Sequence, residues 1–244
     1  MNMKLFMEIH SDMPRQGPGC TEATRRAFEN IPDIPQGVRV LDIGCGPGAQ
    51  TLDLARLVEP FNGEVIAVDL YEQYLDEARQ ATEQSGLQNI TFQKADMTDL
   101  PFDDASFDII WSEGAIYNMG FENGLRDWKR RLKPGGAIAV TEISWLKDDI
   151  PETAHEFWAE GYPAMQTVEG NLEIIDRCGY RILDHFTLPE NAWLDNYYNP
   201  LEKRFPLFKD RDGSDELIAM ETAEIELYRN YSNYYGYEFY ILQQ

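Results

Sequence analysis

Val40-Leu41-Asp42-Ile43-Gly44-Cys45-Gly46-Pro47-Gly48 is the stretch of sequence that decides the fold. Residues 38–43 form a short apolar and β-branched run, typical of a buried strand, and residues 49–58 carry apolar side chains at helical spacing. The three glycines therefore stand at a strand-to-helix turn, where backbone without Cβ lets the chain reverse sharply and lets a ligand lie against main-chain N–H groups. The stretch predicts a binding site for a nucleotide-type cofactor.

Asp69 provides a second acidic strand end further along the chain. It closes the apolar run of residues 64–68, and it follows Gly48 by roughly 20 residues, the distance at which a doubly wound fold brings a carboxylate to a ribose. The glycine pattern also satisfies a dinucleotide fingerprint, because Gly44-x-Gly46-x-x-Ala49 is allowed when alanine comes last. These residues alone leave the choice of cofactor open.

Three later motifs narrow that choice. They are Asp96-Met97-Thr98-Asp99-Leu100-Pro101-Phe102, Ser106-Phe107-Asp108-Ile109-Ile110 and Leu132-Lys133-Pro134-Gly135-Gly136. With the glycine turn and Asp69, they make residues 38–145 resemble the class I S-adenosylmethionine-dependent methyltransferases, and especially the small-molecule branch that includes the ubiquinone and menaquinone biosynthesis methyltransferases. A nicotinamide-dependent dehydrogenase is not expected to carry the first and third of these motifs, so it remains a minor alternative.

The net charge of −22 and the isoelectric point of about 4.4 limit the partners of this chain. A field of this sign repels phosphate backbones and anionic lipid headgroups, so we expect no nucleic acid and no membrane surface as a partner. Three widely spaced cysteines suit free thiols better than a disulfide framework. No segment has the pattern of a signal peptide or of a transmembrane helix, which predicts a cytoplasmic protein. A homodimer is left open.

Strand and helix signals alternate along the chain, as a parallel sheet requires. We therefore expect a doubly wound α/β fold with residues 1–244 in one domain: an N-terminal flap and helix (1–37), a cofactor-binding core (38–145) and the remaining sheet (146–244). The resemblance implies a mostly parallel sheet of seven strands, with the last strand antiparallel beside the fifth. Residues 146–166 and 189–213 fall outside the core pattern and are expected to form helical lid inserts over the ligand edge.

The resemblance also implies which residues bind S-adenosylmethionine. Asp69 is expected to accept hydrogen bonds from the ribose hydroxyls, Asp96 to accept one from the adenine amine, and Leu70 and Met97 to pack on the adenine ring. The glycine turn contributes Asp42, Gly44, Gly46 and Gly48, with Cys45 as a small filler residue. Arg15, beside a turn rich in Pro and Gly, is a candidate for the carboxylate of the methionine moiety. No metal site is expected.

The methyl acceptor is expected to be a small molecule, and three residues are candidates for catalysis. Glu113 and Tyr117 follow the fourth strand, where the methyl group would point, and Glu113 is a candidate for the cofactor's amine as well. His155 lies in the first insert and is the histidine best placed to remove a proton. The main alternative to an enzyme is a noncatalytic S-adenosylmethionine-binding regulator or scaffold, because fold and cofactor site do not establish turnover.

Overall fold

The sheet of this protein is built around strand β1 (Arg39–Ile43), which leads into the glycine turn. The computed structural model describes residues 3–13 and 15–244, and the predicted N-terminal flap therefore includes three residues, 1, 2 and 14, outside this part. The strands lie in the order β3-β2-β1-β4-β5-β8-β7, with β6 paired to β5. The other strands are β2 (Glu64–Asp69), β3 (Ile90–Lys94), β4 (Phe107–Ser112), β5 (Leu132–Trp145), β6 (Gln166–Thr167), β7 (Arg181–Thr187) and β8 (Tyr235–Gln243).

The sheet is parallel except where β8 enters it. β8 lies antiparallel between β5 and β7, with Ala137 opposite Gln243 and Trp145 opposite Tyr235. This confirms the predicted doubly wound α/β fold with an antiparallel last strand. The sheet has eight strands rather than seven, because β6 pairs with the end of β5 at Ser144 and Trp145. A two-residue strand has no periodicity to reveal it in the sequence.

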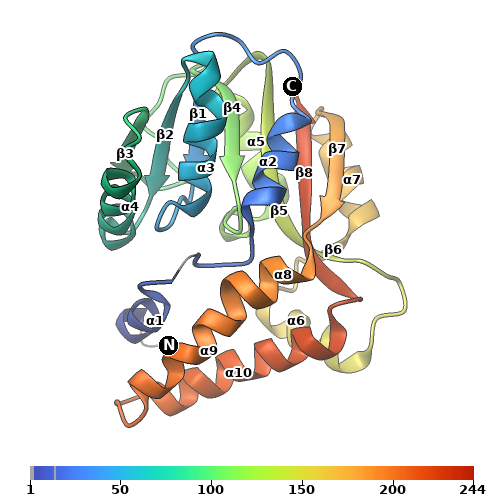
Figure 1. Ribbon diagram of the computed structural model, residues 1–244. Coiled ribbons are helices and arrows are strands. Elements are labelled where there is room, and N and C mark those ends of the chain that lie inside the picture. Colours follow the sequence, from blue (N-terminus) through green and yellow to red (C-terminus); the bar gives the residue numbers. More distant parts are fainter. Residues whose placement is uncertain (1–2, 14) are drawn as a thin grey trace.

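Helices cover both faces of the sheet (Figure 1). One face is covered by α2 (Thr21–Glu29), α3 (Ala49–Val58) and α4 (Glu72–Ser85), and the short η1 (Glu59–Phe61) packs against the same core. On the other face lie α5 (Phe121–Lys129) and α7 (Val168–Arg177), preceded in the chain by η2 (Ile116–Asn118). Alternate residues of β1 serve the two cores: Val40 contributes to the first and Leu41 to the second.

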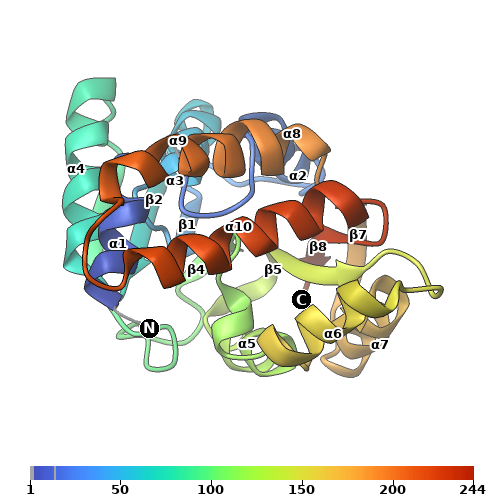
Figure 2. The ribbon, with the colours of Figure 1, turned by 90° about the horizontal axis from the view of Figure 1, so that it is seen from below.

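A layer of further helices covers the carboxyl ends of the parallel strands (Figures 1 and 2). We call this layer the cap; it consists of α1 (Met3–His10), α6 (Glu152–Gly161), α8 (Glu190–Trp193), η3 (Leu194–Tyr198), α9 (Asn199–Phe208) and α10 (Ser214–Tyr231). The two expected inserts contribute α6 and α8 to α9, and the N-terminal segment contributes α1. The cap continues beyond residue 213 through α10, which runs beside α9 (Figure 2). No helix of the described residues is both long and apolar enough to cross a bilayer.

The buried face of α10 differs from the one that its apolar residues predict. Met220 is expected to point inward, yet 48% of its surface is exposed, whereas Leu217, Glu221, Ile225 and Tyr228 are buried. The positions of the buried residues follow helical spacing, but a glutamate takes one of them. Because a glutamate takes one of these buried positions, hydrophobicity alone does not identify the buried face of α10.

Candidate functional site

The glycine turn joins β1 to α3 in a backbone conformation that other residues rarely adopt. Gly44, Gly46 and Gly48 all have positive φ, at 71°, 53° and 88°. A Cβ on Gly44 would lie 2.5 Å from the Cβ of Ala115, and one on Gly48 would lie 2.9 Å from the Cβ of Ala78. Glycine is therefore required both for the turn and for the close approach of neighbouring segments. Gly48 serves the packing of α3 on α4 and does not line the pocket described below.

Asp42 holds this turn from beneath rather than facing a ligand. Its side chain is fully buried; Oδ2 accepts a hydrogen bond from Thr51 Oγ1 at 2.6 Å, and Oδ1 accepts one from Gln50 Nε2 at 3.4 Å. Burial raises the pKa of Asp42 to about 7. The expected direct contact with the cofactor is not supported by this position, since Asp42 does not line the pocket. It positions the start of α3.

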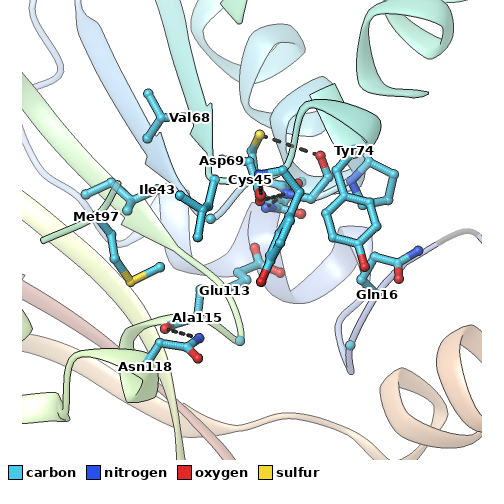
Figure 3. A pocket seen from close by; sticks show the side chains of 18 of the residues that line it. Gln16, Ile43, Cys45, Val68, Asp69, Tyr74, Met97, Glu113, Ala115 and Asn118 are labelled. Atoms are coloured by element: carbon cyan, nitrogen blue, oxygen red, sulfur yellow. Dashed lines mark hydrogen bonds between the residues drawn. The ribbon is translucent and has the colours of Figure 1, made fainter. Parts of the chain in front are cut away.

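A cavity of about 500 Å³ opens beside the turn, within the range typical of sites for small molecules (Figure 3). Most of the residues expected at the site meet there: Arg15, Gly44, Cys45, Gly46, Asp69, Leu70, Asp96, Met97, Glu113 and Tyr117 all line it. In Figure 3, Met97 and Tyr74 lie on opposite sides of the cavity, with Asp69 and Cys45 between them at the turn. The cavity thus joins the ends of β1, β2 and β4.

Asp69 is fixed at this junction by two backbone donors. Its Oδ2 accepts the N–H of Gly46 and its Oδ1 accepts the N–H of Tyr71, each at 2.9 Å. A carboxylate oxygen accepts more than one hydrogen bond, so both oxygens keep capacity for hydroxyl donors in the cavity. Burial raises the pKa of Asp69, and the backbone donors oppose that rise. The geometry suits a carboxylate that binds a diol.

Asp96 and its neighbours form the wall farther along the cavity. Asp96 Oδ1 accepts the backbone N–H of Thr98 at 2.8 Å and the Thr98 hydroxyl at 2.7 Å, and these hydrogen bonds lower its pKa. Met97 is half-buried, and its carbonyl accepts a hydrogen bond from Trp128 Nε1. Leu70 is 48% exposed at the cavity wall. These side chains offer a carboxylate and two apolar surfaces to a flat ring.

Arg15 and Glu113 form a buried ion pair in the cavity wall. Arg15 Nη1 donates to Glu113 Oε2 at 3.0 Å, and Arg15 Nη2 lies 3.7 Å from Asp53 Oδ2. Glu113 Oε1 also accepts hydrogen bonds from Thr24 Oγ1 at 2.7 Å and from Trp111 Nε1 at 2.9 Å. The pair offers one positive and one negative group side by side, which matches an amino acid zwitterion.

A family model described as a methyltransferase domain matches residues 34–203, which include the turn, most of the cavity lining and part of the cap. The chain belongs to the methyltransferase domain family. This confirms the resemblance seen in the sequence motifs. The matched range ends within α9.

Curated relatives of this methyltransferase-family chain cover it in part. The ubiquinone/menaquinone biosynthesis C-methyltransferase UbiE of Azotobacter vinelandii is 39% identical over 167 residues, which are 68% of this chain and 64% of that protein. Methyltransferase GfsG of Streptomyces halstedii is 32% identical over 176 residues, 70% of this chain and 58% of that protein. The chain therefore spans less than two thirds of the length of either relative.

Solved structures share the fold over nearly the whole chain. A methyltransferase from Geobacter sulfurreducens, in complex with S-adenosyl-L-homocysteine, superposes with a TM-score of 0.81 and covers 98% of this chain and 97% of its own. Its sequence is 21% identical, so this similarity establishes the fold alone.

The three residues predicted as catalytic candidates lie in different surroundings. His155 is exposed on α6, where its ring stacks on Trp145, and it does not line the cavity. The geometry therefore does not support His155 as the base. Glu113 is held by three donors, as a binding group is, rather than left open to take a proton. Tyr117 lines the cavity as Glu113 does, and 39% of its surface is exposed.

Several residues that line the cavity were missed by sequence reasoning. Gln16 lines the cavity beside Arg15, and its Oε1 is buried without a hydrogen-bond partner among the described residues. Phe6 and Met7 reach the cavity from α1, and Tyr74 reaches it from α4. The place of Gln16 next to Arg15 is a signal that sequence reasoning overlooked; the others depend on how α1 and α4 pack. In the described part of the chain, no three His, Cys, Asp or Glu side chains are grouped as metal ligands would be.

Proposed function

We propose that this protein transfers the methyl group of S-adenosylmethionine to a small-molecule acceptor. The observation that supports this proposal is the meeting of Gly44, Gly46, Asp69, Asp96 and the Arg15–Glu113 pair around one cavity. These residues come from the turn after β1, from the ends of β2, β3 and β4 and from the N-terminal segment. Membership of the methyltransferase domain family agrees with it.

The residues present fit each part of this cofactor. Asp69 would accept hydrogen bonds from the ribose hydroxyls, and Asp96 would accept one from the adenine amine, with Leu70 and Met97 against the ring. Arg15 would bind the carboxylate of the methionine moiety and Glu113 its ammonium group. The glycine turn admits the ligand because Gly46 has only Gln16 near the place of a Cβ, at 3.7 Å.

The protein's own contribution to the reaction is alignment and exclusion of water. S-adenosylmethionine supplies a methyl group already activated by its sulfonium. The side chains at the end of β4 then need to hold the acceptor in line with that methyl. When the nucleophile is already electron-rich, this alignment contributes far more to the reaction rate than a general base does. The cap closes this end of the sheet (Figure 2), which supports a shielded acceptor site.

Calorimetry and a transfer assay test the proposal together. The protein is expected to bind S-adenosylmethionine and S-adenosylhomocysteine more tightly than NAD, and to move a labelled methyl group to members of a small-metabolite library. Tighter binding of NAD would contradict the cofactor assignment. Tight binding of S-adenosylhomocysteine without transfer to any acceptor, including DNA, RNA and protein, would favour the noncatalytic alternative. Methylation of a macromolecule in preference to every small molecule would contradict the small-molecule acceptor.

A further inference from the structure

Glu142 is a buried carboxylate that the proposed cofactor site does not use. It lies near the end of β5, in a run of buried residues, with 2% of its surface exposed. Its Oε1 accepts a hydrogen bond from the Tyr162 hydroxyl at 2.7 Å. Its Oε2 is buried and has no hydrogen-bond partner in the part of the chain that the structure describes. A half-satisfied buried carboxylate is costly, and such a group calls for a ligand or a function.

The surroundings of Glu142 connect it with the cofactor cavity. The ring of Tyr162 lies 6.1 Å from the ring of Tyr117, which lines that cavity. The backbone N–H of Gly114, also in the cavity wall, donates to Thr141 Oγ1 at 2.7 Å, one residue before Glu142. Val140 of β5 pairs with Ser112, the last residue of β4, and Glu142 lies two residues further along β5. Glu142 therefore lies beside the end of β4, at the edge of the sheet where the cavity opens.

Tyr237 and Glu224 belong to the surroundings of Tyr117 as well. The Tyr237 hydroxyl lies 3.7 Å from the place of a Cβ on Gly114. Burial raises the pKa of the Tyr237 phenol, and the fields of Tyr117, Glu142 and Glu224 add to that rise. Glu224, from α10 of the cap, accepts a hydrogen bond from the Tyr198 hydroxyl at 2.9 Å. Burial also raises the pKa of the Tyr117 phenol, and the fields of Glu224 and Glu142 add to that rise.

No positive side chain balances these carboxylates. Within residues 3–13 and 15–244, neither Glu142 nor Glu224 forms an ion pair with Lys, Arg or His. Arg15, the cation of the adjoining cavity, is already paired with Glu113 and Asp53. Two carboxylates among tyrosine rings form an environment that favours a cation, through direct charge attraction and through the ring faces.

We propose that the methyl acceptor is a small amine, held as a cation between Glu142 and Glu224 and against Tyr117 and Tyr237. This inference rests on the proposed methyl transfer and names its class of substrate. Glu142 Oε2 takes one proton from the bound ammonium group, which leaves the nitrogen with a free electron pair. That pair forms a bond to the methyl carbon as the carbon–sulfur bond breaks and its electrons return to sulfur. The product leaves as an N-methyl ammonium ion, and Glu142 releases its proton to solvent.

Matched pairs of amines and alcohols test this proposal on the complete chain. Benzylamine is compared with benzyl alcohol, and ethanolamine with ethylene glycol, by calorimetry on the complex with S-adenosylhomocysteine and by transfer of a labelled methyl group. We expect at least one amine of a wider panel of such pairs to bind more tightly than its alcohol and to be methylated. Glu142→Gln and Glu224→Gln are each expected to lower that binding by roughly ten- to a hundredfold, the loss of one charge-assisted contact.

The control variant is Glu226→Gln, an exposed acid two residues further along α10, and it is expected to change amine binding by less than twofold. Equal losses in Glu226→Gln and Glu224→Gln would show a general effect of net charge and would overturn the proposal. So would a panel in which no amine binds better than its alcohol, or transfer to alcohols or thiols that Glu142→Gln leaves unchanged. Failure to bind S-adenosylhomocysteine at all would instead count against the proposed methyl transfer.

Discussion

Two aspartates at strand ends, Asp42 and Asp69, have different tasks although both lie next to the glycine turn. Asp42 is fully buried and binds Thr51, whereas Asp69 lines the cavity and binds backbone N–H groups of Gly46 and Tyr71. Asp69→Asn removes the charge from the expected ribose acceptor. We expect it to weaken binding of S-adenosylhomocysteine by about 1–3 kcal/mol in calorimetry, the range for a hydrogen bond to a charged group. Asp99→Asn, in an exposed position, is the control; equal affinity in the two variants would mean that the ribose is held elsewhere.

His155 provides a second prediction at the scale of single residues. Its exposed ring stacks on Trp145 outside the cavity, so it has no route to a proton of the acceptor. His155→Ala is therefore expected to leave kcat within about twofold of the unmodified protein, because surface substitutions of this kind rarely change a site. Tyr117→Phe, in the cavity wall, is the comparison in the same transfer assay. A tenfold loss of kcat in His155→Ala with unchanged cofactor binding would contradict this prediction and would indicate that His155 acts as the base.

At the scale of elements, the attachment of α1 to α9 controls one wall of the cavity. The guanidinium of Arg204 donates to the carbonyl of Ile9 at 2.6 Å and to that of Glu8 at 3.0 Å, at the carboxyl end of α1. Helix ends have unpaired carbonyls, and a cation there is favourable. Since Phe6 of α1 lines the cavity, loss of this contact should loosen the cofactor site.

Arg204→Met is therefore expected to raise the Kd for S-adenosylhomocysteine by about three- to tenfold, the loss of one or two hydrogen bonds at a mostly buried position. Trypsin is expected to cleave after Arg15 faster in this variant, and S-adenosylhomocysteine to slow that cleavage. Lys203→Met, an exposed neighbour on α9, serves as the control. Unchanged affinity and cleavage in Arg204→Met would show that α1 is held by its apolar contacts alone.

For the whole molecule, buried carboxylates dominate the dependence of stability on pH. Burial raises the pKa of Asp42 to about 7 and the pKa values of Glu142 and Glu221 to about 8. A raised carboxyl pKa means that the folded state binds the proton more tightly than the unfolded state, so its stabilising effect is complete at low pH and is lost as pH rises through the folded-state value. Burial lowers the pKa of His10, so that this side chain stays neutral above pH 6.5 and does not oppose the trend.

Without ligand, the protein is accordingly expected to lose stability between about pH 6.5 and pH 9, by at least about 1 kcal/mol for each of Glu142 and Glu221. Thermal unfolding at these two values of pH measures the change. Glu142→Gln and Glu221→Gln should each reduce the fall in Tm, while Glu226→Gln should not. An equal fall in all four proteins would assign the effect to the net charge of −22 instead.

The sequence predicted the elements that repeat a local pattern. Val40 to Ile43 and Glu64 to Asp69 are predictable as strands because short, largely apolar runs are typical of a parallel sheet that is covered on both faces. The glycine turn was predictable because positive φ is a property of single residues. Asp69, Asp96 and Glu113 come at or just after the ends of strands that meet at one edge of the sheet, so they could be expected around one cavity before the fold was known.

Only the tertiary structure decided how distant segments meet. The pairing of Arg15 with Glu113, the exposure of His155 and Met220, and the end of the cap at Tyr231 depend on packing between elements far apart in sequence. Glu142 is an acidic residue in a largely apolar part of β5, which is a visible signal. Its meaning requires Tyr162 and Tyr117 beside it. Local spacing predicts which face of an element is buried; it does not specify which other surface covers that face, because burial depends on area and shape rather than on the identity of the partner.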